Sequence, residues 1–174
     1  MDRTGRQEHV SDSEDRMKES HVIAELSRLM ELEIDALQAY DVAIAWVGGA
    51  GTTIGGELAR FKVEHQRHAL ALHEALHALG GRAPDVEPDV QGVVIGALTP
   101  PLRRLNAQEL LEAMRWNEQL TTAVYRKVLG TPLPADVRAL VERAGDDEQR
   151  HLAWLEEALA RAIWLDTSSV AALP

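Results

Sequence analysis

A glutamate and a histidine, Glu148 and His151, stand three residues apart in the segment Asp147-Glu148-Gln149-Arg150-His151. Residues three apart lie on one face of an α-helix, with Cβ atoms roughly 5–6 Å apart, so Glu148 and His151 can reach a common point. Both fall on an apolar stripe with spacings of four and three: Val137, Val141, Ala144, Leu155, Ala158 and Ala162. The pair therefore interrupts a buried face, where carboxylate and imidazole groups together are typical ligands of a divalent metal ion.

The same polar segment occurs twice in the chain. Residues 64–76 align without gaps on residues 147–159, and seven of the thirteen positions are identical. In this alignment His68 matches His151. Each copy follows a helical stretch with a glutamate seven residues before a tyrosine: Glu33 with Tyr40, and Glu118 with Tyr125. The sequence therefore predicts a duplicated helical hairpin whose repeats carry the polar residues with them.

The helices of the first hairpin are delimited by caps and glycines. Ser20 is expected to cap the first helix, which runs to about Val47. Gly48-Gly49-Ala50-Gly51 ends that helix, a short turn at Thr52-Thr53 follows, and the second helix stops at Gly80-Gly81.

The second hairpin shows similar signals. Asn106 is expected to cap the third helix and to form a capping box with Glu109. That helix ends near Gly130, and Thr131-Pro132-Leu133-Pro134 is a tight connection to a fourth helix, which runs to about Ile163.

The two hairpins are joined by residues 82–106, which lack a sustained helical period and contain four prolines. Two adjacent antiparallel helices usually need only about 2–8 connecting residues, so this segment is long enough to run the length of a bundle, with Val93-Val94-Ile95 packed against it. The prediction is an all-α four-helix bundle made of two antiparallel hairpins and a long crossover. Counted from the hairpin turns at 1.5 Å per residue, six polar residues fall at nearly one height: Glu33, His65, His68, Glu118, Glu148 and His151.

Length and composition limit the alternatives. The 174 residues favour one domain, with a polar flexible tail over residues 1–20, the bundle over residues 21–165 and a C-terminal tail over residues 166–174. The absence of cysteine excludes disulfides and thiolate metal sites and fits the cytoplasm. The net charge of −10 without a basic cluster argues against nucleic acid, and no apolar run approaches the roughly 20 residues of a membrane helix.

This arrangement resembles the ferritin-like superfamily, the four-helix bundles of ferritins, rubrerythrins and related di-iron proteins, and is most similar to small bacterial members of poorly defined role. The resemblance covers residues 21–165. It implies a di-metal carboxylate site whose ligands include Glu33, His68, Glu118, Glu148 and His151. It also implies iron, two ions per chain, with manganese or zinc as other candidates, and oxidation of Fe(II) by dioxygen or peroxide in iron handling or oxidative-stress defence.

One position departs from the superfamily pattern. Where a metal-bridging glutamate is expected on the second helix, this chain has His65, and Glu64 stands one residue to the side. Either His65 is a ligand or Glu64 rotates into the site, and the loss of negative charge favours a single-metal or mixed-metal site as well. Tyr40 and Tyr125 are expected to form hydrogen bonds with glutamate or histidine ligands, and Asp147 to act as an outer acceptor.

The sequence also allows a function without catalysis. A bundle whose site holds zinc, a single metal ion or nothing would be a non-catalytic structural or partner-binding protein, so the sequence leaves open whether the chain is an enzyme at all. The missing cysteines exclude a rubredoxin-type electron path within the chain. Four tryptophans lie partly off the inner stripes and leave a homodimer open: Trp46, Trp116, Trp154 and Trp164.

Overall fold

The computed structural model describes residues 4–84 and 106–166, with the backbone alone for residues 4–15. Within these ranges the chain forms four long helices, one short 3-10 helix and no strand. The elements are α1 (Thr4–Trp46), α2 (Thr53–Ala78), α4 (Ala107–Leu129), α5 (Ala135–Ala160) and η2 (Ile163–Leu165). The predicted all-α fold of four helices is confirmed for this part of the chain. None of the described helices is both long and apolar enough to cross a membrane.

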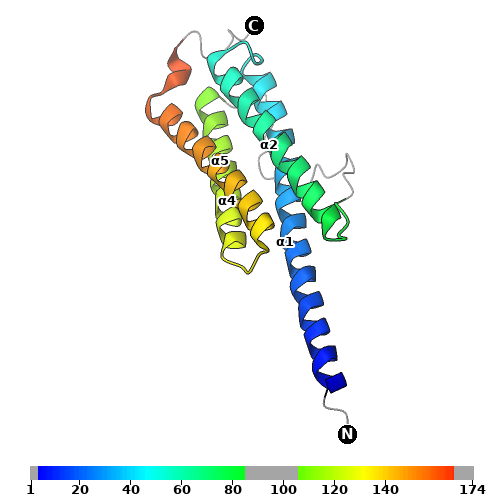
Figure 1. Ribbon diagram of the computed structural model, residues 1–174. Helices are drawn as coiled ribbons and strands as arrows, with labels where there is room; N and C mark the ends of the chain where they lie inside the picture. The colour runs from blue at the N-terminus through cyan, green and yellow to red at the C-terminus, as the bar shows by residue number, and fades with distance from the viewer. Residues whose placement is uncertain (1–3, 85–105, 167–174) are drawn as a thin grey trace.

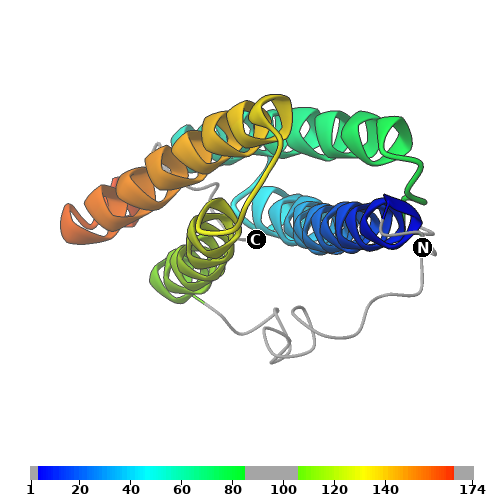
Figure 2. The ribbon, with the colours of Figure 1, turned by 60° about the horizontal axis from the view of Figure 1, so that its bottom comes forward.

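The helices pack as two antiparallel hairpins that lie side by side (Figures 1 and 2). Helix α1 packs along α2 and α4 along α5, while α1 also contacts α4 and α2 contacts α5. Helices α2 and α4 run in the same direction, so the end of α2 and the start of α4 lie at opposite ends of the bundle (Figure 1). This is the placement that the predicted crossover requires.

Two parts of the prediction lie outside the described residues. The middle of the crossover falls on residues 85–105, and it includes the apolar segment 93–95 that was expected to pack along the bundle. The C-terminal tail falls on residues 167–174, apart from its first residue. The evidence for a crossover between the hairpins is therefore the position of the end of α2 and of the start of α4, at opposite ends of the bundle.

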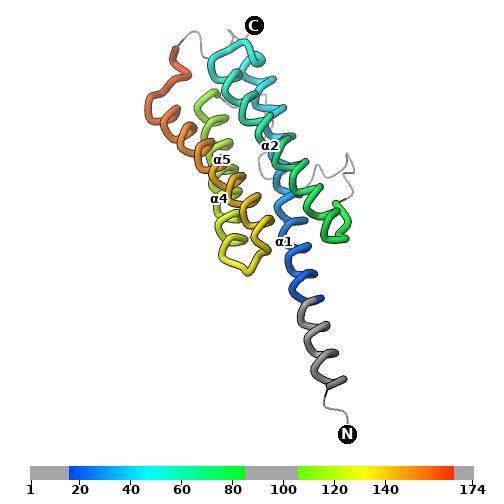
Figure 3. The backbone as a smooth tube through the Cα atoms, in the orientation of Figure 1, coloured from blue at the N-terminus to red at the C-terminus, as the bar shows by residue number. Residues whose placement is uncertain are grey.

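Helix α1 begins well before the expected position. It spans 43 residues, and Ser20 lies inside it. Figure 3 traces the coloured part of α1 as one unbroken helix. The prediction that Ser20 caps the first helix is therefore wrong. The preceding residues include helix-favouring Arg, Gln, Glu, Met and Lys, and an exposed serine inside a helix costs only roughly 0.5 kcal/mol relative to alanine. The division of the chain into tail and bundle at residue 21 stays a prediction.

Two glycines reverse the chain between α1 and α2, as predicted. Gly48 and Gly49 have φ angles of 90° and 89°, in the left-handed region that glycine adopts without steric penalty. Thr52 then caps α2, because its hydroxyl accepts a hydrogen bond from the backbone N–H of Gly55 at 3.0 Å. This turn fixes the relative height of the first two helices.

The second hairpin has the predicted capping box. Asn106 accepts a hydrogen bond from the backbone N–H of Glu109 at 3.0 Å, and the Glu109 carboxylate accepts one from the N–H of Asn106 at 2.8 Å. Helix α5 ends at Ala160, slightly before the predicted end near Ile163, because Ala162 adopts a left-handed conformation with φ 49°. Cap chemistry therefore sets the start of α4 and a backbone reversal sets the end of α5.

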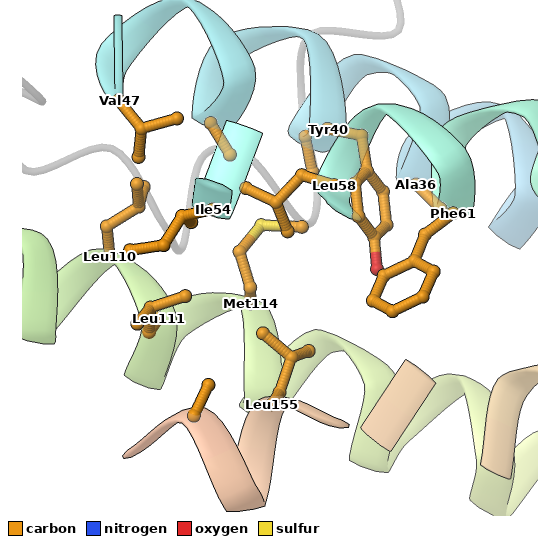
Figure 4. Packing of buried hydrophobic residues seen from close by; sticks show 13 residues of the cluster. Ala36, Tyr40, Val47, Ile54, Leu58, Phe61, Leu110, Leu111, Met114 and Leu155 are labelled. Atoms are coloured by element: carbon orange, nitrogen blue, oxygen red, sulfur yellow. The ribbon is translucent and has the colours of Figure 1, made fainter. Parts of the chain in front are cut away.

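Two apolar clusters fill the bundle on either side of its middle. Figure 4 shows the first cluster, whose larger members come from all four helices: Tyr40, Val47, Ile54, Leu58, Phe61, Leu110, Leu111, Met114 and Leu155. The second cluster includes Val22, Leu26, Leu29, Met30, Leu72, Leu76, Tyr125, Val128, Val137 and Val141. On each helix the polar residues singled out from the sequence lie between members of the two clusters. Dense packing on both sides therefore holds the four helices around one polar layer.

Candidate metal centre

Six acidic and histidine side chains meet in this polar layer. Five of them are fully buried, and the sixth, His68, is only 6% exposed. They come from all four helices: Glu33 (α1), His65 and His68 (α2), Glu118 (α4), and Glu148 and His151 (α5). The structure thus brings together all six residues that the sequence singled out as metal ligands.

The first group of ligand atoms belongs to Glu33, His65, His68 and Glu148, and these atoms lie within 4.8 Å of one another. His65 Nδ1 lies 2.8 Å from Glu33 Oε2, and His68 Nδ1 lies 3.1 Å from Glu148 Oε1. Two longer contacts close the group, 3.5 Å from His68 Nδ1 to Glu33 Oε2 and 3.4 Å from His65 Nδ1 to Glu148 Oε1. Two imidazole nitrogens and two carboxylates therefore converge from three helices.

The second group belongs to His65, Glu118, Glu148 and His151, also within 4.8 Å. His151 Nδ1 lies 3.8 Å from Glu118 Oε2 and 3.9 Å from Glu148 Oε2. In the part of the chain that the structure describes, each residue of this group has one buried atom without a hydrogen-bond partner: His65 Nε2, Glu118 Oε2, Glu148 Oε2 and His151 Nδ1. An unpaired buried polar atom costs about 1–3 kcal/mol, so a cation that bound all four atoms would remove a large penalty.

These residues fit a pair of divalent ions. His65 and Glu148 belong to both groups, so two ions would share them. The donors are carboxylate oxygens and imidazole nitrogens without any thiolate, a set that suits iron, manganese or zinc. The three carboxylates would also offset most of the charge of two divalent ions in a buried layer.

Two tyrosines hold the carboxylates that the groups do not share. The Tyr40 hydroxyl donates a hydrogen bond to Glu118 Oε1 at 2.7 Å, and the Tyr125 hydroxyl donates one to Glu33 Oε1. Each bond crosses from one hairpin to the other. The sequence predicted hydrogen bonds from these tyrosines to glutamate or histidine, and the structure has both of them. Each bond restricts the rotation of a carboxylate whose other oxygen faces a ligand group.

Two outer carboxylates orient the histidines that belong to one group only. His68 Nε2 lies 2.9 Å from Asp147 Oδ2, and His151 Nε2 lies 2.6 Å from Glu64 Oε2. A ring nitrogen that donates its N–H to a carboxylate leaves the other nitrogen free as a ligand. Both histidines therefore present Nδ1 to the layer. Glu64 lies outside both groups, and of the two alternatives considered from the sequence, the structure places His65 among the ligand atoms.

Arg150 joins these outer carboxylates, a role that the sequence did not indicate. Its guanidinium pairs with Asp147 and lies 3.3 Å from Glu64 Oε2. Arg67, at the matching position of the first repeat, lies 3.3 Å from Glu64 Oε1. The recurrence of arginine in both repeats was a signal, but an exposed helical arginine looks the same in a sequence whether or not it has a structural partner.

Comparison of the chain with known proteins identifies no family. No protein-family model matches the chain, and no curated protein matches it significantly. Membership of the ferritin-like superfamily therefore stays a prediction from the sequence.

Burial and neighbouring charges shift the proton affinities within the layer. Burial and the charges of Glu118 and Glu33 raise the pKa of Glu148 well above its usual value, although the charge of His65 opposes this. Burial lowers the pKa of His65, but the surrounding carboxylates outweigh burial and raise that pKa well above its usual value. Burial raises the pKa of Glu33 and Glu118, yet the neighbouring histidines outweigh burial, so both pKa values lie below the usual range. The two shared residues therefore bind protons more tightly than usual, and protons would compete with metal ions for them.

Proposed function

We propose that this chain is a metal-binding protein of the ferritin-like type, with two metal ions in the middle of its bundle. The observation that supports this most strongly is the set of four unpaired buried atoms, one from each residue of the second group. Buried polar groups in folded proteins are almost always paired. A divalent cation would accept an electron pair from each of the four atoms, and no apolar neighbour can do so.

We further propose that the ions are iron and that the chain oxidises Fe(II) with dioxygen or peroxide, in iron handling or oxidative-stress defence. One glutamate from each of two helices, with an acid and a histidine three apart on a third, is close to the ligand pattern of di-iron carboxylate bundles. Bound iron would supply electron transfer to the oxidant. Manganese and zinc are the other ions that this ligand set accepts.

The chain's own residues would bind, orient and shield the ions. Tyr40 and Tyr125 orient the carboxylates of Glu118 and Glu33. Asp147 and Glu64 fix the tautomers of His68 and His151, the histidines that belong to one group only. The Phe61 ring covers His151, with ring centroids 4.3 Å apart, and so keeps water from one side of the second group. Removal of water strengthens the electrostatic interactions of a charged centre with its ligands.

Oxygen consumption after addition of Fe(II) tests this function. The wild-type protein is expected to consume dioxygen faster than Fe(II) alone in buffer, and Glu148→Gln is expected to lose at least about tenfold of that rate because it removes a shared ligand. Glu157→Gln is the matched control, since Glu157 is exposed on the same helix. Equal oxygen consumption by iron with wild-type protein and iron in buffer would contradict the proposed oxidation.

A second function is favoured by the first group of ligand atoms. There, two histidine–carboxylate contacts of 2.8 and 3.1 Å satisfy much of the polar layer without an ion. A non-catalytic bundle with one zinc ion in the second group, serving as a structural or partner-binding protein, would explain this. Zinc does not change its oxidation state, so a protein that binds stoichiometric zinc and consumes no oxygen with Fe(II) would support this alternative.

A further inference from the structure

His65 is the residue in which the two groups meet through different atoms. Its Nδ1 lies 2.8 Å from Glu33 Oε2 in the first group, and its Nε2 lies 3.5 Å from Glu118 Oε1 in the second. Nε2 is buried and has no hydrogen-bond partner within the described chain. The two nitrogens of an imidazole point away from each other, so each faces a different group.

Packing holds the His65 ring in this orientation. The side chain is fully buried, and its ring lies against those of Tyr40 and His151, with centroids 4.9 and 5.1 Å away. Rotation of the ring would break the Nδ1 contact with Glu33 and leave a carboxylate without that partner. The direction of both nitrogens is therefore set by the fold before any ion binds.

We propose that His65 bridges the two metal ions as an imidazolate, with Nδ1 on the ion of the first group and Nε2 on the ion of the second. A neutral imidazole has one nitrogen lone pair for a metal, whereas a ring without its N–H proton has one on each nitrogen. Each ion replaces one ring proton, at Nδ1 in the first group, where the N–H faces Glu33, and at Nε2 in the second. Both N–H bonds break, the protons leave to solvent, and no electron is transferred. This inference rests on the proposed function because it requires an ion in each group.

Charge balance supports the bridge. With neutral histidines, three carboxylates face two divalent ions and leave one positive charge in a buried layer. An imidazolate at His65 supplies the fourth negative charge. Uncompensated buried charge is unfavourable, and bundles with a glutamate on all four helices reach the same total with carboxylates alone.

Nuclear magnetic resonance of protein labelled with 15N-histidine and loaded with 113Cd2+ tests the bridge. A nitrogen bound to cadmium shows a scalar coupling to 113Cd. Both ring nitrogens of His65 are expected to couple, each to a different 113Cd nucleus, and the ring is expected to carry no N–H proton. His68 and His151 serve as internal controls, because only their Nδ1 should couple while Nε2 keeps its hydrogen bond to Asp147 or Glu64.

The outcomes separate this inference from the proposed function. Two bound cadmium ions with coupling at only one nitrogen of His65 would overturn the bridge and leave the metal centre standing. One cadmium ion per chain would also overturn the bridge. Failure of the wild-type protein to bind cadmium, iron or zinc would overturn the proposed function itself.

Substitution gives an independent measurement on the same proteins. His65→Gln removes a ligand from each ion, so the affinities of both should fall about tenfold or more. His68→Gln should weaken only the ion of the first group, and His73→Gln, at an exposed position of the same helix, should weaken neither. A His65→Gln protein in which only one ion is weakened would contradict the bridge.

Discussion

Tyr40 and Tyr125 are the residues through which each hairpin controls a carboxylate of the other. Replacement of Tyr125 by phenylalanine leaves Glu33 Oε1 without its donor, and replacement of Tyr40 does the same to Glu118 Oε1. Loss of such a partner is expected to lower metal affinity about 10–100-fold and to destabilise the metal-free fold by about 1–3 kcal/mol. Metal titration and urea unfolding measure the two effects.

The two substitutions should act on different ions. Tyr125→Phe should weaken the ion of the first group, because Glu33 belongs to that group alone, and Tyr40→Phe should weaken the ion of the second. Equal titration curves for the wild-type protein and both variants would show that the tyrosines do not position the ligands.

Proton competition should make metal binding depend on pH. Glu148 and His65 have raised pKa values, so protons compete with a metal ion for both residues, and metal affinity should fall as pH falls. Glu33 and Glu118 have lowered pKa values and stay ionised, so they should add little to this dependence. The expected slope is about one to two decades of affinity per pH unit below the raised pKa values. A metal titration that gave one affinity from about pH 5.5 to 8 would contradict this reading.

At the scale of the elements, the turn between α1 and α2 sets the height of the first hairpin. A Cβ atom at Gly55 would lie 2.1 Å from the backbone oxygen of Gly49 and 2.7 Å from Thr52 Oγ1, which caps α2. Backbone cannot yield as a flexible side chain can. Gly55→Ala is therefore expected to destabilise the fold by about 1–3 kcal/mol in thermal unfolding followed by circular dichroism.

Gly51 provides the matched control for this substitution. It lies in the same turn, is exposed, and a Cβ atom there would meet nothing within 4 Å. Gly51→Ala should change stability by no more than about 0.5 kcal/mol. Similar unfolding temperatures for Gly55→Ala and Gly51→Ala would mean that the close approach does not constrain the turn.

Sequence signals located the elements where local chemistry decides them. Gly48 and Gly49 ended α1, and Asn106 began α4, because left-handed glycines and capping side chains act within a few residues. The predicted helix start at Ser20 was wrong because a capping residue alone does not begin a helix. A serine is a good cap only if the chain before it is not helical, and the residues that precede Ser20 favour a helix.

At the scale of the whole molecule, the site has an approximate two-fold pattern that joins the repeats. The hydrogen bond from Tyr40 to Glu118 corresponds to the one from Tyr125 to Glu33. In the same way, the contact of His68 with Asp147 corresponds to that of His151 with Glu64. The duplication and the six clustered residues could be predicted, because spacing along a helix fixes which face a residue occupies. The partners across the hairpins could not be predicted, because they depend on how the hairpins dock. For this reason the sequence suggested Glu64 as an alternative ligand to His65, whereas in the structure its carboxylate contacts Nε2 of His151.

Metal removal should lower the stability of the whole bundle, since the ligands come from all four helices and meet only in the folded chain. An ion at 100 times its dissociation constant stabilises a fold by about 2.7 kcal/mol. For a domain of this size, that corresponds to a rise of about 5–10 °C in the unfolding temperature. Differential scanning calorimetry before and after chelation measures this rise. An unfolding temperature that changes with neither metal nor chelator would argue against a metal site in the core.

Metal content is the most direct measure of the central claim that the buried layer is a metal centre. Elemental analysis would use protein purified without chelators or a metal-affinity step. About two ions per chain are expected for the wild-type protein and for the exposed control His73→Gln. Glu148→Ala should lose both ions, because Glu148 belongs to both groups, while circular dichroism shows that it remains helical. A folded wild-type protein with no stoichiometric metal, or a content that Glu148→Ala leaves unchanged, would contradict the claim.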